Sequence, residues 1–78
     1  MSKYKENDYI YVWFGDSGPI ARKVRFKRYT SIPNYCVVAS SGSHLYHIRE
    51  SQIILHAHEN GPQTITYNKN QDKWVHNI

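Results

Sequence analysis

Lysines and arginines recur along one stretch of the chain at spacings that could contact a row of phosphates. This group comprises Lys23, Arg25 and Lys27, with Arg22 and Arg28 beside them and Arg49 further along the chain. On a β-strand every second side chain leaves the same face, roughly 7 Å from the next. Such a row can follow a nucleic-acid backbone. It also fits a solvated strand that resists edge aggregation, or contact with an acidic protein.

Four aromatic side chains could add base stacking to this contact. They are Tyr9, Tyr11, Trp13 and Tyr29. Nucleobases stack on aromatic rings with little sequence preference. Phenol and indole groups also carry a polar atom that favours water or a partner. We therefore expect the first three rings to project outward from the first strand.

A second aromatic group could bind an alkylated cation. It comprises Trp13, Phe14, Tyr35 and Tyr46, with Asp16 as the counter-charge. Several rings around a cation attract it through their quadrupoles. Packing in and around the core of a small β-protein explains the same residues, because aromatic side chains dominate such cores.

The histidines and the single cysteine show no recognisable catalytic or metal-binding pattern. His56 and His58 would share a strand face, but no acidic residue stands at a ligand spacing from them. Cys36 opposite His47 could form a reactive thiolate, whereas a strand interior beside two valines favours an inert buried thiol. We expect no enzyme activity, no catalytic residue, no metal and no other cofactor.

Period-two alternation predicts β-strands as the elements that position these side chains. In residues 8–14, the aliphatic set that includes Ile10 and Val12 should face inward. Residues 20–29 could be taken for an amphipathic helix. However, Val24 and Phe26 alternate with the cations, which favours a strand with these two side chains inside.

A β-hairpin is predicted for residues 35–48. A two-residue turn at Ser41-Gly42 would place Cys36 opposite His47, and a three-residue turn would change that register. Residues 49–52 then form a short crossover into a strand at 53–55.

The end of the chain predicts a second β-hairpin, over residues 63–77. An isolated hairpin is marginally stable in water, so its apolar residues must contact the rest of the domain or a second subunit. Tyr67 and Trp74 are of types favoured as interface anchors. They are therefore candidates for a protein interface.

Two short segments carry a resemblance to the Src-homology-3-like small barrels, in particular their Tudor, chromo-barrel and KOW branches. Residues 7–12, N-D-Y-I-Y-V, are similar to the G-D-x-V-Y-V opening of these domains, and residues 48–53, I-R-E-S-Q-I, resemble their 3₁₀ crossover. The resemblance covers residues 7–56. It implies an all-β, five-stranded barrel that binds nucleic acid, modified peptides or proteins without catalysis.

We predict one domain over residues 1–78, with a flexible N-terminus at 1–7, a barrel at 8–58 and an added C-terminal hairpin. The 10 basic residues outnumber the 6 acidic ones, and the net charge of +4 favours anionic partners. A lone cysteine indicates a cytoplasmic location, and the short apolar runs indicate no membrane association. The abundance of Asn, Lys, Ile and Tyr is typical of AT-rich genomes, phage genomes included.

These observations lead to two functional hypotheses. The first is a non-enzymatic binding module that contacts nucleic acid, or a nucleic-acid-associated complex, through the basic strand. The second is a protein-interaction module, such as a small phage or bacterial accessory factor that binds and modulates a larger host protein. An edge strand or the C-terminal hairpin could also form a homodimer.

Overall fold

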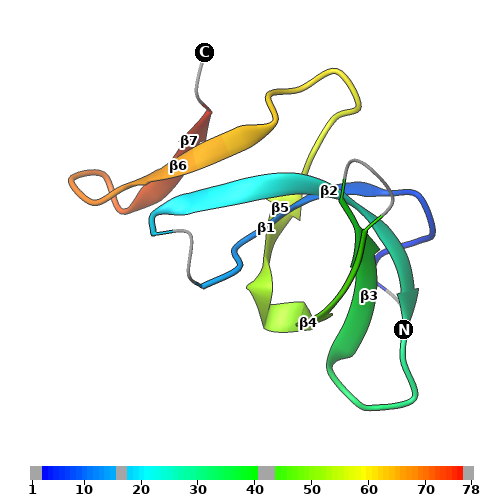
Figure 1. Ribbon diagram of the computed structural model, residues 1–78. Coiled ribbons are helices and arrows are strands. Elements are labelled where there is room, and N and C mark those ends of the chain that lie inside the picture. The colour runs from blue at the N-terminus through cyan, green and yellow to red at the C-terminus, as the bar shows by residue number, and fades with distance from the viewer. Residues whose placement is uncertain (1–2, 16–17, 41–43, 77–78) are drawn as a thin grey trace.

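The computed structural model describes residues 3–15, 18–40 and 44–76, without the side chain of His76. In these residues the prediction of an all-β chain is confirmed: the fold consists of antiparallel strands and one 3₁₀ turn (Figure 1). The elements are β1 (Tyr9–Val12), β2 (Ile20–Tyr29), β3 (Tyr35–Ala39), β4 (Leu45–Arg49), η1 (Glu50–Gln52), β5 (Ile53–His56), β6 (Thr64–Asn68) and β7 (Lys73–His76).

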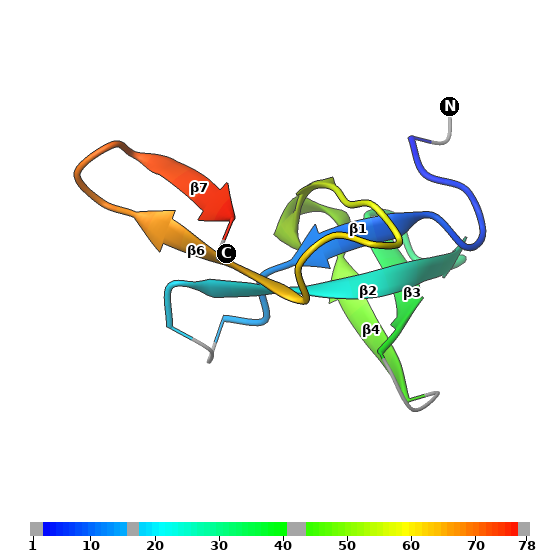
Figure 2. The ribbon, with the colours of Figure 1, turned by 90° about the horizontal axis from the view of Figure 1, so that it is seen from above.

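Strand β2 organises the sheet. The strand order is β4-β3-β2-β1-β5, and β6 pairs with β2 outside this path. Along its edge opposite β1, β2 pairs first with β6, over Ile20–Arg22, and then with β3, over Arg25–Tyr29. The β6–β7 hairpin therefore lies beside the first part of β2, away from β3 and β4, in both views (Figures 1 and 2).

The main core lies on the concave side of the curved sheet. Val24 and Phe26 of β2 are buried there, together with Ile10 and Val12 of β1, as their alternation predicted. The other members of this cluster are Tyr4, Cys36, Val38, Ile48 and Ile53. Burial of these aliphatic and aromatic side chains is the main force that holds the sheet in its curved form.

A second apolar cluster covers the opposite side of β1, and it corrects the expectation that Tyr11 is exposed. Tyr11, Ala21 and Ile65 form this cluster, with Trp74 packed against it. The exposed fraction of Tyr11 is 0%, and its hydroxyl donates a hydrogen bond of 2.6 Å to the carbonyl of Pro62. The β5–β6 loop, residues 57–63, and the hairpin thus cover a face that a single-layered sheet would leave in water.

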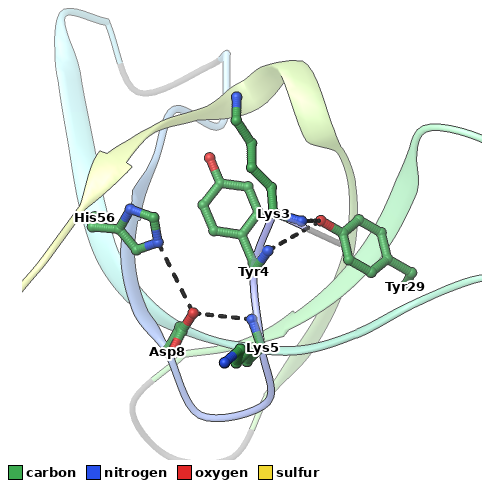
Figure 3. Close-up of polar contacts among 6 residues, drawn as sticks. All are labelled: Lys3, Tyr4, Lys5, Asp8, Tyr29 and His56. Carbon is green, nitrogen blue, oxygen red and sulfur yellow. Dashed lines mark hydrogen bonds and ion pairs between the residues drawn. The ribbon is translucent and has the colours of Figure 1, made fainter. Parts of the chain in front are cut away.

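The N-terminal segment also differs from expectation, because Tyr4 is a core residue with 7% exposure. Its ring lies 5.7 Å from Phe26 and 5.0 Å from His56, measured between ring centroids. The Tyr29 hydroxyl accepts hydrogen bonds from the backbone N–H groups of Lys3 and Tyr4, at 3.1 and 3.3 Å. Figure 3 shows the Tyr4 ring inside the curve of the strands. Residues 3–7 are therefore anchored, not frayed.

The sheet is not closed into a barrel. β4 and β5 are the two ends of the strand path, and within the described residues they do not pair with each other. The three-residue turn η1 connects them directly. The side chain of Tyr4 fills the interior next to β5, through its contact with His56.

The hairpin of β3 and β4 has a register one residue away from the predicted one. Cys36 faces Ile48, and Val37 faces His47. The backbone N–H of Ser40 donates to the carbonyl of His44 at 2.9 Å, whereas the expected turn at Ser41-Gly42 lies outside the described residues. The predicted pair of Cys36 with His47 is therefore wrong, because one residue of register moves every cross-strand partner.

Candidate nucleic-acid interface

The outer face of β2, β3 and β4 carries several of the predicted cations in adjacent rows. Residues directly opposite each other in an antiparallel pair project to the same side, and so do alternate residues of β3. The rows on this face are Arg25–Ala39–Leu45, Arg28–Val37–His47 and Tyr35–Arg49. We call this surface, with Arg25, Arg28, His47 and Arg49 as its charged or titratable members, the basic face.

A β-bulge decides which cations of β2 belong to the basic face. The pairing of β2 with β3 shifts between Phe26 and Arg28, so Arg28, and not Lys27, is the partner of Val37. A bulge places one extra residue on one strand and so interrupts its alternation. Arg25 and Arg28 are exposed, whereas Lys27 is half-buried. The expected row of Lys23, Arg25 and Lys27 therefore ends at the bulge.

Apolar side chains form the floor of the basic face. Val37 and Ala39 are only 2% and 4% exposed, although neither belongs to the two core clusters. Long cationic side chains commonly lay their methylene groups over apolar neighbours and keep the charged group in water. We infer that the side chains of Arg25 and Arg28, together with Leu45, cover these two residues. This packing restricts the arginines while their guanidinium groups stay accessible.

Within the described residues, the positive charge of the basic face has no carboxylate partner. In the described parts of the chain, no lysine or arginine lies within 4.0 Å of a carboxylate oxygen. The ion pair that the structure shows joins His56 Nε2 to Asp8 Oδ2 at 3.9 Å, on the N-terminal side (Figure 3). Uncompensated charge on one face raises the local concentration of anionic partners.

Lys23 has a structural role. Its ammonium group donates hydrogen bonds to the carbonyls of Glu59 at 2.9 Å and Gly61 at 2.8 Å, and a longer one of 3.4 Å to His58. It also lies 5.8 Å from the ring centroid of Tyr9. An ammonium has three donors, and all of these are directed at the β5–β6 loop. Lys23 thus fixes this loop over β1 and β2.

Arg22 lies apart from the other cations. It is exposed, but it occupies the part of β2 that pairs with Val12 of β1 and Thr64 of β6. The basic face begins at Arg25, where β3 replaces β6 along the edge of β2. The structure therefore does not place Arg22 in the same rows as Arg25 and Arg28.

Arg49 is held in place by Tyr35. Its Nε donates a hydrogen bond of 3.3 Å to the Tyr35 hydroxyl, and its guanidinium carbon lies 6.0 Å from the centroid of the Tyr35 ring. Stacking on a ring combined with a hydrogen bond limits the rotamers of the guanidinium group. Arg49 is exposed, so it offers a pre-oriented cation to solvent.

A pocket of about 560 Å³ lies next to Arg49. We call it the N-terminal pocket. Three segments line it: Lys3 with Tyr4, residues 33–35, and residues 49–51 with Ile53. Of the lining residues, Tyr4 and Ile53 are buried, whereas Lys3 and Arg49 are exposed. Sequence reasoning missed this pocket because its walls come from three separate parts of the chain.

The predicted stacking residues mostly serve the fold. The Tyr9 hydroxyl lies 3.5 Å from Glu59 Oε1, Tyr11 is buried, and Tyr29 binds the N-terminal backbone. Trp13 keeps an exposed ring, although its indole N–H donates to the carbonyl of Gly18 at 2.7 Å. Within the described residues, Trp13 is thus the predicted ring that solvent reaches most readily.

The predicted aromatic cage is separated into two contacts. The rings of Phe14 and Tyr46 meet edge to face with centroids 5.4 Å apart, whereas Tyr35 contacts Arg49. Asp16, the proposed counter-charge, lies outside the described residues. The arrangement of these rings is accounted for by packing at the rim of the core.

Tyr67 and Trp74, the predicted interface residues, contact each other on the C-terminal hairpin. Their ring centroids lie 5.4 Å apart with an edge-to-face tilt. Trp74 packs against the second apolar cluster, and Tyr67 donates a hydrogen bond to Asp72. Both side chains are half-buried. Trp74 thus attaches the hairpin to the domain, whereas the side chain of Tyr67 contacts other hairpin residues. A part of each ring stays accessible.

Cys36 is a free thiol inside the main core. Burial, with a smaller contribution from the charge of Glu50, raises the pKa of this thiol above its ordinary value. A raised pKa disfavours the nucleophilic thiolate. Among the residues described, no three histidine, cysteine, aspartate or glutamate side chains gather as a possible metal site.

Comparisons with protein-family models, with curated proteins and with solved structures find no match for this chain. In the part of the chain that the structure describes, no helix has the length and apolar character needed to cross a membrane. The basic face and the N-terminal pocket are therefore the features of this chain that bear on its function.

Proposed function

We propose that this chain is a non-enzymatic module that binds nucleic acid through the basic face. The observation that carries the proposal is the set of neighbouring exposed arginines, Arg25, Arg28 and Arg49, without carboxylate partners among the described residues. Cations that neutralise phosphates release condensed counterions, and this release drives binding. The net charge of +4 adds a favourable long-range attraction.

The predominance of arginine supports nucleic-acid binding over the alternative that the basic face is only a solvated strand surface. Arginine presents several planar donors that match phosphate oxygens in pairs, and it is less strongly hydrated than lysine. Arg49 is already oriented by Tyr35, so little side-chain entropy is lost when it binds. We infer that Arg25 and Arg28 also pack over the buried Val37 and Ala39, and such packing would support their side chains.

We also propose that the domain is related in architecture to the Src-homology-3-like small barrels. The support is the strand order β4-β3-β2-β1-β5 and the 3₁₀ turn Glu50–Gln52 directly before β5. The buried free thiol of Cys36 favours a reducing compartment, and we propose a cytoplasmic location on this basis.

A charge-reversal experiment tests the proposed function. Arg25→Glu with Arg28→Glu changes the net charge from +4 to 0, since each substitution replaces a positive charge by a negative one. Lys69→Glu with Lys73→Glu, on exposed positions of the C-terminal hairpin, makes the same change away from the basic face. Binding to labelled single-stranded and duplex oligonucleotides is measured by fluorescence anisotropy between 50 and 200 mM salt.

We expect the arginine pair to reduce the slope of log affinity against log salt by at least about 1.5, because each phosphate contact contributes roughly 0.7–0.9. The lysine pair should retain most of this slope. Equal weakening by both pairs would show a general charge effect and would contradict a contact at the basic face.

A second function, protein binding, is favoured by strand β4. Within the described residues β4 pairs on one side only, and it exposes Leu45 by 61% and Tyr46 by 43%. An open strand edge with apolar side chains can accept a strand from another protein. If protein binding is the function, the protein should still capture its partner from lysate treated with nuclease, and Leu45→Asp should abolish this capture. If nuclease treatment abolishes the capture, the result supports the first proposal.

A further inference from the structure

We infer that the N-terminal pocket receives one unpaired nucleobase that carries an exocyclic amino group, while the basic face binds the adjoining phosphates. This inference rests on the proposed function and specifies which nucleic acid the module prefers. It predicts single strands over duplexes, and cytosine or adenine over thymine.

The pocket and the basic face are continuous. Tyr35 and Arg49 form one row of the basic face, and the same two residues line the pocket. A strand whose phosphates contact Arg25 and Arg28 therefore reaches the pocket at Arg49. The exposed guanidinium of Arg49 can contact a phosphate or stack on a base, as arginine does in complexes with single strands.

The polarity of the pocket suits a base inside and a phosphate outside. Its lining combines the buried side chains of Tyr4 and Ile53 with the exposed cations Lys3 and Arg49. A volume of about 560 Å³ lies in the usual range for small-ligand pockets, roughly 300–1,000 Å³. The flat, neutral base can thus contact the buried side chains while the adjoining phosphate contacts the exposed cations.

Glu50 specifies the kind of base. It is the carboxylate among the pocket-lining residues, and it is half-buried there. A carboxylate repels an anionic group but accepts hydrogen bonds from an amino group, such as N4 of cytosine. Thymine presents a carbonyl at the corresponding position, so Glu50 disfavours it.

The β3–β4 side of the pocket is held by backbone contacts. The backbone N–H of Glu50 donates a hydrogen bond of 2.8 Å to the carbonyl of Asn34, directly beside the paired residues Tyr35 and Arg49. Asn34 adopts a left-handed backbone with φ of 69°, a conformation that asparagine tolerates better than most residues. Pre-orientation lowers the entropy lost on binding.

The test compares single-stranded oligo-dC with oligo-dT of equal length, at neutral pH and at fixed salt. We expect the unmodified protein to bind oligo-dC about tenfold more tightly, in the range seen for one specific contact to a base edge. Glu50→Gln supplies an amide that can donate to the thymine carbonyl. It should reduce the preference to within about twofold.

Glu59→Gln is the matched control, since it makes the same chemical change on the exposed β5–β6 loop. It should leave the preference for oligo-dC unchanged. A second pocket variant, Ser51→Trp, places a large side chain at an exposed lining position. It should abolish the preference for oligo-dC while duplex binding by the basic face persists.

The outcomes separate the two proposals. The pocket inference is overturned, and the proposed function is retained, if the unmodified protein binds oligo-dC and oligo-dT equally well and the double variant Arg25→Glu with Arg28→Glu loses this affinity. Failure of the unmodified protein to bind any oligonucleotide overturns both. The inference is supported if the unmodified protein prefers oligo-dC, if Glu50→Gln and Ser51→Trp each remove this preference, and if Glu59→Gln retains it.

Discussion

Replacement of Lys23 by methionine distinguishes a cation that holds the fold from one that binds a partner. The Lys23 ammonium donates to carbonyls of the β5–β6 loop, at 2.8, 2.9 and 3.4 Å. Arg25 lies two residues further along β2 and is exposed without such contacts in the described structure. Methionine retains an unbranched, flexible side chain of similar length and removes the donors.

The magnitude follows from these hydrogen bonds. A hydrogen bond that involves a charged group contributes about 1.5–3 kcal/mol. The two short bonds to Glu59 and Gly61 dominate, and water can replace part of the interaction because Lys23 is only half-buried. We expect Lys23→Met to lower the free energy of unfolding by about 2 kcal/mol, which corresponds to a fall of roughly 8–16 °C in Tm for a domain of this size.

Thermal and urea unfolding measure the stability, and salt titrations of nucleic-acid affinity measure the binding. Arg25→Met is the control: its Tm should stay close to that of the unmodified protein, while its salt slope falls by about 0.7–0.9. Our assignment of Lys23 would be refuted by a Lys23→Met variant that keeps its stability and loses as much salt slope as Arg25→Met.

Four further predictions concern the core and the buried titratable groups. Tyr4→Ala should lower the free energy of unfolding by about 3–4 kcal/mol because it empties a core position. Tyr29→Phe should lower it by about 1–2 kcal/mol because it removes the acceptor for two backbone N–H groups. Urea unfolding measures both changes. Burial raises the pKa of the Cys36 thiol above its ordinary value of 9.0. It also raises the pKa values of the phenols of Tyr4, Tyr11 and Tyr29 above their ordinary value of 10.0. The unfolded chain therefore releases these protons first, so Tm should fall as the pH rises above about 9. A flat profile from about pH 9 to pH 11 would contradict this prediction. Cys36 should react with a thiol reagent at pH 8 far more slowly in the native protein than in denaturant, and equal rates would place it outside the core.

Local alternation predicted much of the fold. Val24 and Phe26 alternate with cations over a stretch with strong strand propensity, and this pattern indicated both a strand and its buried face. The 3₁₀ turn at Glu50–Gln52 and the C-terminal hairpin also lie where the sequence predicted them. Each of these signals is contained within a few neighbouring residues.

The errors arose where contacts join distant parts of the chain. Alternation placed Tyr11 opposite Ile10 and Val12, but it carries no information on whether a second layer covers that face. The carbonyls that bind Lys23 lie 35 to 38 residues away, and a lone aromatic residue such as Tyr4 has no period to reveal its burial. The bulge before Arg28 has no local signal either, and it changed the membership of the basic face.

The division of one edge of β2 between β6 and β3 has a consequence for how the protein opens. Release of β6 would break backbone hydrogen bonds such as the one from the Lys23 N–H to the Gln63 carbonyl and would uncover Ala21, while β3 could keep its pairing from residue 25 onward. Amide hydrogens of the hairpin should therefore exchange with solvent through a partial opening, ahead of those in β3. The chain would then behave as two cooperative units that share a single strand.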